Sequence, residues 1–460
     1  MKRLIPVALL AGCTTVGPDY ERPDMRLPEK YLQEERLVQA TPAVSPDWWT
    51  LYGDATLNDL VASSRARNSD MRLAAARVSE AQALLREAGA LYVPEVTGGA
   101  AASRSRVSTR AIPAPQPGSV DREQYQLLAS TSFELDFWGR FARANEAAQA
   151  LLLSSQLSQD TVALTLAGAT AQAYFALRSL DAQVAVLDNT VRVRRDSLAI
   201  VRSRAQAGLT SDLDIYQAEG ALSDALVERA DALRQRALVE RQLAVLAGRL
   251  DLKVASGELF ALPLPPTPPA GLPSELLERR PDVRAAEQNL VAANAQVGVA
   301  RAALFPSISL TASLGAQSAE LSTLLSSGAG IWSIGFALAQ PIFDGGRREA
   351  RVEQAQARRE QVLAGYQRSV ETAFREVADA IVNVEESARN EEQLRARLDA
   401  ARNALELSTL RYESGYSPYI EVLDAQRTAN LAELVFVRNR QARLAFSVDL
   451  MRALGGGWQN

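Results

Sequence analysis

The residue types that most often carry out catalysis are almost missing from this chain. Its 460 residues include one cysteine, Cys13, and no histidine. Histidine is the commonest general base and metal ligand near neutral pH, and a lone cysteine can form neither an internal disulfide nor a cysteine-rich metal site. An enzyme would have to rely on carboxylates, and no nucleophile–base arrangement is readable. We therefore expect no enzyme, no cofactor and no metal site.

Cys13 stands where a lipid is attached in many exported proteins. A positively charged start leads into a short apolar run, Leu4–Ala11, and small residues directly precede the cysteine. This order is typical of a secretory signal, and it resembles a bacterial lipobox. We expect residues 1–12 to be removed and Cys13 to be acylated, and Thr14 after it favours sorting to the outer membrane. The alternative is a buried cysteine after a chance apolar run.

The carboxylates of most interest lie at two turns, "AGLTSDLD" from Ala207 and "SGYSPYIEVLD" from Ser414. Gly208 and Gly415 suit left-handed helix ends. Ser211 and Ser417 are expected to cap the helices that follow, with Pro418 at the first helical position.

The three acids of these turns differ in how well helix capping explains them. Ser211-x-x-Asp214 is a capping box, so Asp214 has a structural explanation. Glu421 lies near a helix start, where the helix dipole also favours a carboxylate. Asp424 lies beyond the first turn, where the dipole has faded, and capping does not explain it.

The elements that position these turns come from a duplicated chain. "RAQAGLTSDLDIYQAEGAL" from Arg204 matches "RYESGYSPYIEVLDAQRTA" from Arg411 at an offset of 207 (411 − 204). "SDMRLAAA" from Ser69 matches "PDVRAAEQ" from Pro281 at an offset of 212 (281 − 69). Each half reads helix, two strands, long helix, tight turn, helix. The proline-rich join "ALPLPPTPPAGLP" from Ala261 is a stiff, extended connector.

The duplication predicts the boundaries of the chain. We expect a signal peptide at 1–12, an N-terminal segment at 13–53, a first repeat at 54–248, a connector at 249–272, a second repeat at 273–455 and a C-terminal tail at 456–460. Within the first repeat, strands are expected near 93–107 and 123–137 and a hairpin tip at 208–214. Within the second repeat, strands are expected near 305–316 and 331–342 and a hairpin tip at 415–421. The glycines Gly455–Gly457 predict that this tail is flexible.

The long helices carry a coiled-coil pattern. From about Arg140 to Ala207 only Gly168 interrupts the helical pattern, and apolar residues recur at alternating three- and four-residue spacing, with Arg194 as the one exception. An uninterrupted helix of this length would measure roughly 100 Å. A compact globule needs no helix of this length, and a rod-like coiled-coil spacer would account for it.

The predicted strands alternate between apolar and small or polar residues. "EQYQLLASTSFELDFWG" from Glu123 places Tyr125, Leu127 and Phe133 on one face, and "GIWSIGFALAQ" from Gly330 places Trp332 and Phe336 on one face. Segments of about ten residues with this alternation are typical of lipid-facing barrel strands, although a soluble sandwich shows it too.

Composition narrows the remaining classes. The net charge is −4 and the sequence pI about 5.4, with no cationic block, which argues against nucleic-acid binding. No window of about 18 residues is continuously apolar. If the chain enters a membrane, its strands must do so as part of a closed barrel. Because even small barrels need about eight strands, the four strands of this chain must combine with those of other copies.

These residues resemble a known family. The motifs "CTTVGPDYERP" at Cys13, "PDWWTLYGDATLNDLV" at Pro46, "QPIFDGGRR" at Gln340 and "RYESGYSPYIEVLDAQRTANLAE" at Arg411 are similar to those of the outer-membrane efflux channel family, the TolC/OprM-like outer membrane factors, and in particular to its lipoprotein, NodT-like branch. The similar pieces follow the family order and cover nearly the whole chain.

The resemblance implies a mixed α+β membrane protein. It implies a homotrimer in which three subunits, with four strands each, share one transmembrane β-barrel in the outer membrane, and long α-helices form a coiled-coil barrel across the periplasm. It also implies partners: outer-membrane lipid, a periplasmic membrane-fusion adaptor and an inner-membrane RND-type pump. The channel would export small toxic molecules passively.

The resemblance assigns roles at the two tips. By similarity, the periplasmic gate would involve Glu421, Asp424, Asp214 and Tyr412. An arginine found near the second tip in some members is Ser417 here. The adaptor would dock at Gly208, Leu209, Thr210, Gly415 and Tyr416.

Two other functions stay open at this stage. Type I protein secretion would use the same architecture. A non-conducting coiled-coil envelope lipoprotein would need the helices but not the alternating strands.

Overall fold

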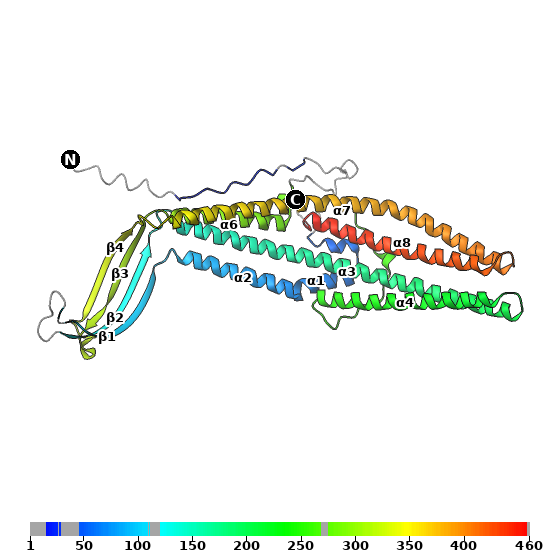
Figure 1. The fold of residues 1–460 in the computed structure, drawn as a ribbon, viewed down its shortest axis with the longest axis horizontal. Coiled ribbons are helices and arrows are strands. Elements are labelled where there is room, and N and C mark those ends of the chain that lie inside the picture. The colour runs from blue at the N-terminus through cyan, green and yellow to red at the C-terminus, as the bar shows by residue number, and fades with distance from the viewer. Residues whose placement is uncertain are drawn as a thin grey trace. The chain divides into compact units, whose positions relative to one another are not determined.

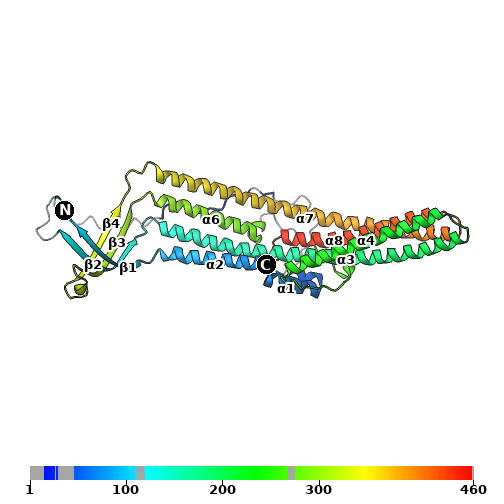
Figure 2. The same ribbon diagram turned by 60° about the horizontal axis from the view of Figure 1, so that its bottom comes forward.

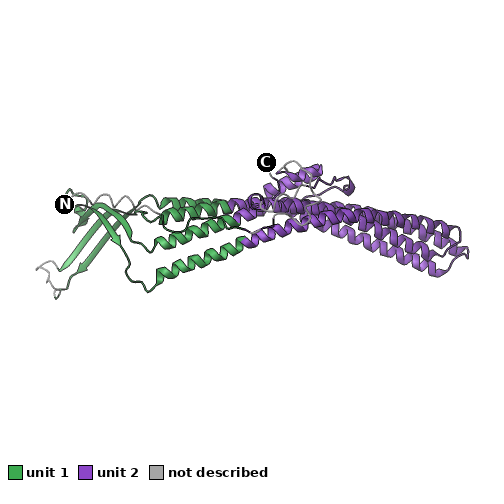
Figure 3. Cartoon of the chain, turned by 90° about the horizontal axis from the view of Figure 1, so that it is seen from above, with its two compact units in different colours: residues 1–24, 78–154, 286–366 green, residues 25–77, 155–285, 367–460 purple. Residues whose placement is uncertain are grey.

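The structure is a computed structural model that describes residues 15–25, 27–28, 46–108, 110, 120–267 and 275–457. The predicted signal peptide and Cys13 lie outside the described residues. The chain divides into two compact units (Figure 3): unit 1 comprises 1–24, 78–154 and 286–366, and unit 2 comprises 25–77, 155–285 and 367–460. Within the described ranges, none of the helices combines the length and the apolar character needed to cross a membrane.

The element order confirms the internal duplication. The first half contains α2 (Ser69–Ala90), β1 (Glu95–Arg106), β2 (Asp121–Glu134), α3 (Arg140–Gln206) and α4 (Asp212–Leu246). The second half contains α6 (Pro281–Ala302), β3 (Ser307–Ser318), β4 (Gly330–Ala339), α7 (Arg347–Glu413) and α8 (Tyr419–Ala453). Matching helices have equal lengths of 22, 67 and 35 residues. Their starts are 212 (281 − 69), 207 (347 − 140) and 207 (419 − 212) residues apart.

Shorter elements complete the chain. They are η2 (Trp48–Tyr52), α1 (Ala55–Arg67), η3 (Leu259–Ala261), α5 (Leu276–Arg279) and η5 (Leu321–Thr323). The carboxylate of Asp54 caps α1 by accepting a hydrogen bond from the Leu57 amide.

In unit 1 the strands form one antiparallel sheet in the order β1-β2-β3-β4 (Figure 1), so the two halves of the chain meet between β2 and β3. Alternation places Val96, Leu127, Leu314, Trp332 and Ile334 on one face, and these side chains are exposed.

The other face of the sheet carries hydroxyl groups. Register aligns Thr97 with Ser130, Ser130 with Ser313 and Ser313 with Ser333, one hydroxyl from each strand. The Thr97 and Ser130 hydroxyls are 3.0 Å apart, and those of Ser313 and Ser333 are 2.7 Å apart. The predicted apolar and polar faces are therefore both present.

Two strands end earlier than the alternation predicts. β2 ends at Glu134 because Asp136 turns to cap α3, where its carboxylate accepts hydrogen bonds of 2.9 Å from the amides of Phe141 and Ala142. β4 ends at Ala339, two residues before Pro341, which lacks the amide that a ladder needs.

In unit 2 the hairpins α3–α4 and α7–α8 run side by side to their tips (Figure 2). Most of the predicted seam of α3 is buried, including Leu177, Leu187 and Val201. Trp48 and Tyr52 are buried in the main core, with Tyr52 against Phe175 at 4.8 Å between ring centroids.

The connector is held to unit 2 by a buried ionic network. Both oxygens of Asp181 are used: they accept hydrogen bonds from Arg178 at 2.7 Å, from Arg236 at 2.7 Å and from the Gly257 amide at 3.1 Å. Arg178 also donates to the carbonyl of Ala255. The connector therefore packs as an ordered part of the unit over residues 249–267.

The prediction of a flexible glycine tail is wrong for Gly455 and Gly456. Both have left-handed backbones, with φ of 98° and 88°, and the Gly456 amide donates to the carbonyl of Met451 at 2.8 Å. A Cβ on Gly456 would lie 2.5 Å from a methyl carbon of Leu164. The glycines end α8 in a Schellman-like turn that packs against neighbouring helices.

Candidate functional site: the two hairpin tips

Both tips of unit 2 end their first helix with the same turn. Gly208 and Gly415 adopt left-handed backbones with φ of 69° and 81°. One residue further on, the Leu209 amide donates to the carbonyl of Arg204 and the Tyr416 amide to that of Arg411, at 2.9 and 2.8 Å. The duplication thus reproduces each turn hydrogen bond for hydrogen bond.

The two tips start their second helix differently. Ser211 caps α4 by accepting from the Leu213 amide at 3.1 Å, but Asp214 accepts a short hydrogen bond from the Thr210 hydroxyl and not from the cap, so the predicted capping box does not form. At the second tip Pro418 is the N-cap, and the buried Ser417 hydroxyl has no partner among the described residues. The prediction that Ser417 caps α8 is therefore wrong.

An apolar core joins the four helices just behind the tips. It contains Leu198, Val201, Ala218, Tyr412, Tyr419 and Val422. The rings of Tyr412 and Tyr419 are 5.5 Å apart. Burial raises the pKa of the Tyr419 hydroxyl, and the positive charge of Arg194 offsets this only in part. Tyr412 is thus a core residue that links α7 to the other three helices.

Arg204 is a tip residue to which the sequence analysis gave no role. Its guanidinium donates to the carbonyls of Tyr412 and Glu413 at 2.8 and 3.0 Å and lies 4.6 Å from the centroid of the Tyr412 ring. It therefore caps the C-terminal end of α7 from the neighbouring hairpin. The sequence does contain one indication of a role for Arg204: the duplication aligns it with Arg411, so an arginine occurs at this position in both halves.

The structure places the second-tip acids on α8, each beside an arginine. Glu421 lies 3.7 Å from Arg411, and Asp424 lies 2.8 Å from Arg427. All four side chains are well exposed, so these pairs contribute little to stability. On the first tip, Asp214 accepts its hydrogen bond from Thr210. It therefore has a different partner from the two acids of α8.

The outermost residues of the tips are open to solvent. Leu209 is 73% exposed and Tyr416 is 80% exposed. A Cβ on Gly208 or Gly415 would meet nothing within 4 Å. Neither apolar side chain is covered by the rest of the described chain.

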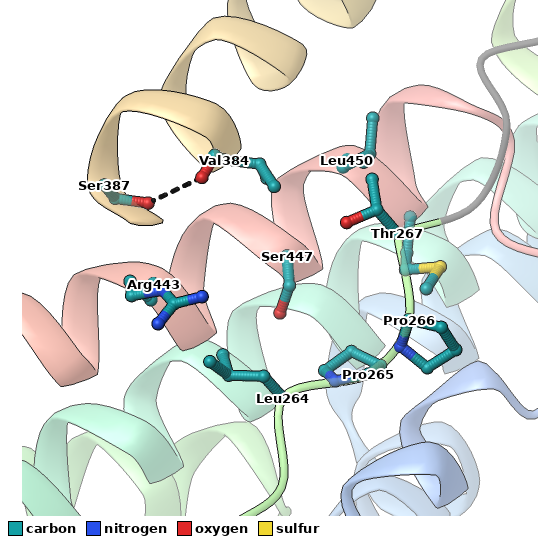
Figure 4. Close-up of a pocket in the computed structure, with 10 residues that line it drawn as sticks. Leu264, Pro265, Pro266, Thr267, Val384, Ser387, Arg443, Ser447 and Leu450 are labelled. Atoms are coloured by element: carbon teal, nitrogen blue, oxygen red, sulfur yellow. Dashed lines mark hydrogen bonds between the residues drawn. The ribbon is translucent and has the colours of Figure 1, made fainter. Parts of the chain in front are cut away.

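Elsewhere in unit 2, the connector closes a small cavity against α7 and α8 (Figure 4). Its volume is about 40 Å³, and Pro265, Pro266, Ser387, Arg443 and Ser447 are among its lining residues. This leaves room for water but none for a drug-sized ligand. Within the described ranges, no group of three or more acidic side chains is arranged to hold a metal ion.

Comparison with known proteins shows the same duplication. The family model "Outer membrane efflux protein" matches residues 60–249 and again residues 272–456, one match in each half. The chain is 36% identical to the outer membrane protein OprJ of Pseudomonas aeruginosa over 456 residues, covering 98% of this chain and 95% of OprJ. It is 32% identical to the cation efflux system protein CusC of Escherichia coli over 468 residues, covering 99% of each.

Solved structures agree with this relationship. The outer-membrane channel OprN superposes with a TM-score of 0.90 at 30% identity and covers 97% of this chain and 100% of its own. The open state of the MtrE channel of Neisseria gonorrhoeae gives a TM-score of 0.86 at 29% identity, covering 96% and 98%. This chain therefore belongs to the outer membrane efflux protein family and is an outer-membrane channel protein rather than an enzyme.

Proposed function

We propose that this chain is the exit duct of a tripartite efflux system, through which drugs or other small toxic molecules leave passively for the cell exterior. The observation that carries the proposal is the four-stranded sheet, with one exposed apolar face and one face of hydroxyls. In lipid, the free edges at β1 and β4 must find partners. Three copies would close the sheet with 12 strands (3 × 4), apolar side outward.

The proposed periplasmic gate lies at the tips. Tyr412 would hold the hairpins together through the tip core, and Glu421, Asp424 and Asp214 would line the opening. If three copies bring Glu421 and Asp424 together, the like charges repel one another and attract cations, which gives the opening a cation preference and a pH sensitivity. The exposure of both acids supports this role.

The proposed partners meet the same tips from outside. A periplasmic membrane-fusion adaptor would contact Gly208, Leu209, Thr210, Gly415 and Tyr416, and it would connect the duct to an inner-membrane RND-type pump that supplies the energy. The exposed side chains of Leu209 and Tyr416 supply apolar contact area for this docking. An acyl group on Cys13 would hold the chain to outer-membrane lipid.

The first test is single-channel conductance of the purified protein in planar bilayers. Wild type should open rarely, and the double change Glu421→Ala, Asp424→Ala should increase conductance, because it removes the proposed acidic ring. Asp231→Ala, which removes an exposed acid of α4 far from the tips, should behave like wild type. Stable trimers without conductance in any variant would favour a non-conducting tether and contradict the proposal.

A further inference from the structure

A short segment near the N-terminus is bound to α6 by a buried carboxylate. We call residues 15–22 the strap; it belongs to unit 1, as do the parts of α3 and α6 that it contacts. Arg22 donates two hydrogen bonds to Glu287, at 2.6 and 2.8 Å, and the Tyr20 hydroxyl donates a third at 3.1 Å. Glu287 is only 5% exposed. A bidentate arginine pair of this kind is among the stronger polar contacts in proteins.

Two further buried side chains bind the strap. Asn294 of α6 donates to the carbonyl of Pro18 at 2.8 Å, and Arg143 of α3 donates to Asp19 at 2.6 Å. Both donating side chains, Asn294 and Arg143, are buried. Burying a polar side chain is costly unless its hydrogen bonds are made, so the strap completes the packing of these helices.

The backbone of the strap fits closely against the residues of α6 and α3 that bind it, which we call its seat: Glu287, Asn294, Gly298 and Arg143. Gly17 has φ of 116°, and a Cβ at this position would lie 2.5 Å from the Cα of Gly298 on α6. The Val16 amide donates to the carbonyl of Trp138 at 3.0 Å. Thr15 contacts Gly139, where a Cβ would lie 2.7 Å from its methyl group. The strap therefore has one register, and its first residues lie where β2 passes into α3.

Aromatic residues lie at the end of the sheet where β2 passes into α3 and β3 begins, which we call the foot of the sheet. Trp138 stacks on Phe305 with 4.7 Å between ring centroids, and its indole donates to the carbonyl of Pro306, directly before β3. Amphipathic aromatic residues of this kind favour the boundary between lipid and water.

The duplication supplies an internal comparison. The offset of 212 pairs Glu287 with Ala75 and Gly298 with Arg86, and the offset of 207 pairs Arg143 with Ala350. The first half of the chain therefore lacks the carboxylate and the close-approach glycine, and α7 lacks the arginine. The seat exists only where the strap lies, which argues that these residues serve the strap and not the general helix packing.

We propose that the strap is a docking segment that fixes the membrane anchor of the N-terminus at the foot of the sheet. The inference rests on the proposed acylation of Cys13, two residues before Thr15. Two residues reach at most about 7 Å. Docking therefore ties the lipid to the level at which the strands begin, so that the anchor and the sheet enter the membrane together.

The test uses the protein as it is after removal of the signal peptide. It compares the variants Glu287→Gln and Arg22→Gln with the control Glu87→Gln, which changes an exposed acid of α2. Protease Glu-C cleaves after glutamate, and release of the N-terminal peptide ending at Glu21 reports an undocked strap. We expect cleavage at least tenfold faster in both strap variants and unchanged in the control. Arg22→Gln leaves the helices intact, so a folding defect of Glu287→Gln does not remove the test.

The same samples test the positioning role. Strap variants should keep the acyl mass on the released peptide and normal conductance per channel, but their oligomers should lose heat resistance and insert less often into bilayers. Unchanged cleavage would overturn the docking contacts. Faster cleavage with normal insertion and heat resistance would overturn the positioning role. A wild-type peptide without an acyl group would overturn the anchor, and loss of conductance in every sample would instead contradict the channel function.

Discussion

Arg194 is a charged side chain at a position where the pattern of α3 predicts an apolar one. It is 8% exposed, its Nε atom is buried without an acceptor, and among the described residues no side chain or carbonyl forms an ion pair or hydrogen bond with it. The matching residue of the second half, 207 positions later, is Ala401, which is buried in an apolar cluster. A buried polar nitrogen without a hydrogen bond is costly, so Arg194 weakens the packing behind the tips.

Arg194→Met should therefore stabilise the protein. Methionine keeps much of the side-chain volume and removes the unsatisfied nitrogen, and we expect the free energy of unfolding to rise by about 1–3 kcal/mol. Urea denaturation followed by circular dichroism measures the change. Arg192→Met alters an exposed arginine two residues away and should have little effect. A lower midpoint for Arg194→Met would mean that the charge has a partner in the assembled protein.

At the scale of elements, the tip turns depend on glycine for a reason that helix interiors do not share. Gly208→Ala should cost about 1–2 kcal/mol, because only glycine adopts the left-handed backbone without strain. Gly220→Ala, in open space on α4, should instead add up to about 1 kcal/mol, because alanine favours the helix. Urea midpoints of the two variants should move in opposite directions. A loss of stability in both would point to a shared contact at these glycines.

The sequence predicts elements well where their signals are local. The matched strings fix the duplication, and period-two alternation fixes the strand faces. Element ends are less predictable, because they depend on local backbone geometry and capping. Asp136 ends β2 early by capping α3, and α8 begins after Pro418 without a side-chain cap from Ser417.

Contacts between distant segments leave no local signal. Arg22 and Glu287 are 265 residues apart, and Arg204 reaches the carbonyl of a residue 208 positions away. Each is an ordinary charged residue in its own stretch of sequence. The tip acids could be located from the sequence, but the arginines that face them required the structure.

At the scale of the whole molecule, the two faces of the sheet predict different tolerance to charge. Ile334→Arg places a guanidinium on the apolar face and should cost about 2–4 kcal/mol near the middle of a bilayer. Ser333→Arg, one residue earlier on β4, places the same group on the hydroxyl face and should leave insertion intact while changing conductance. Outer-membrane fractionation and bilayer recordings measure both effects. Equal tolerance of the two changes would place both faces of the sheet in water.

The equal helix lengths of the two halves constrain how the protein can evolve. α3 and α7 each have 67 residues, and α4 and α8 each have 35. Deleting one residue from a single helix shortens it by about 1.5 Å and turns its remaining side chains by about 100° relative to the neighbouring helices. A lineage that changes the reach of this molecule must therefore change four helices in concert, by whole turns.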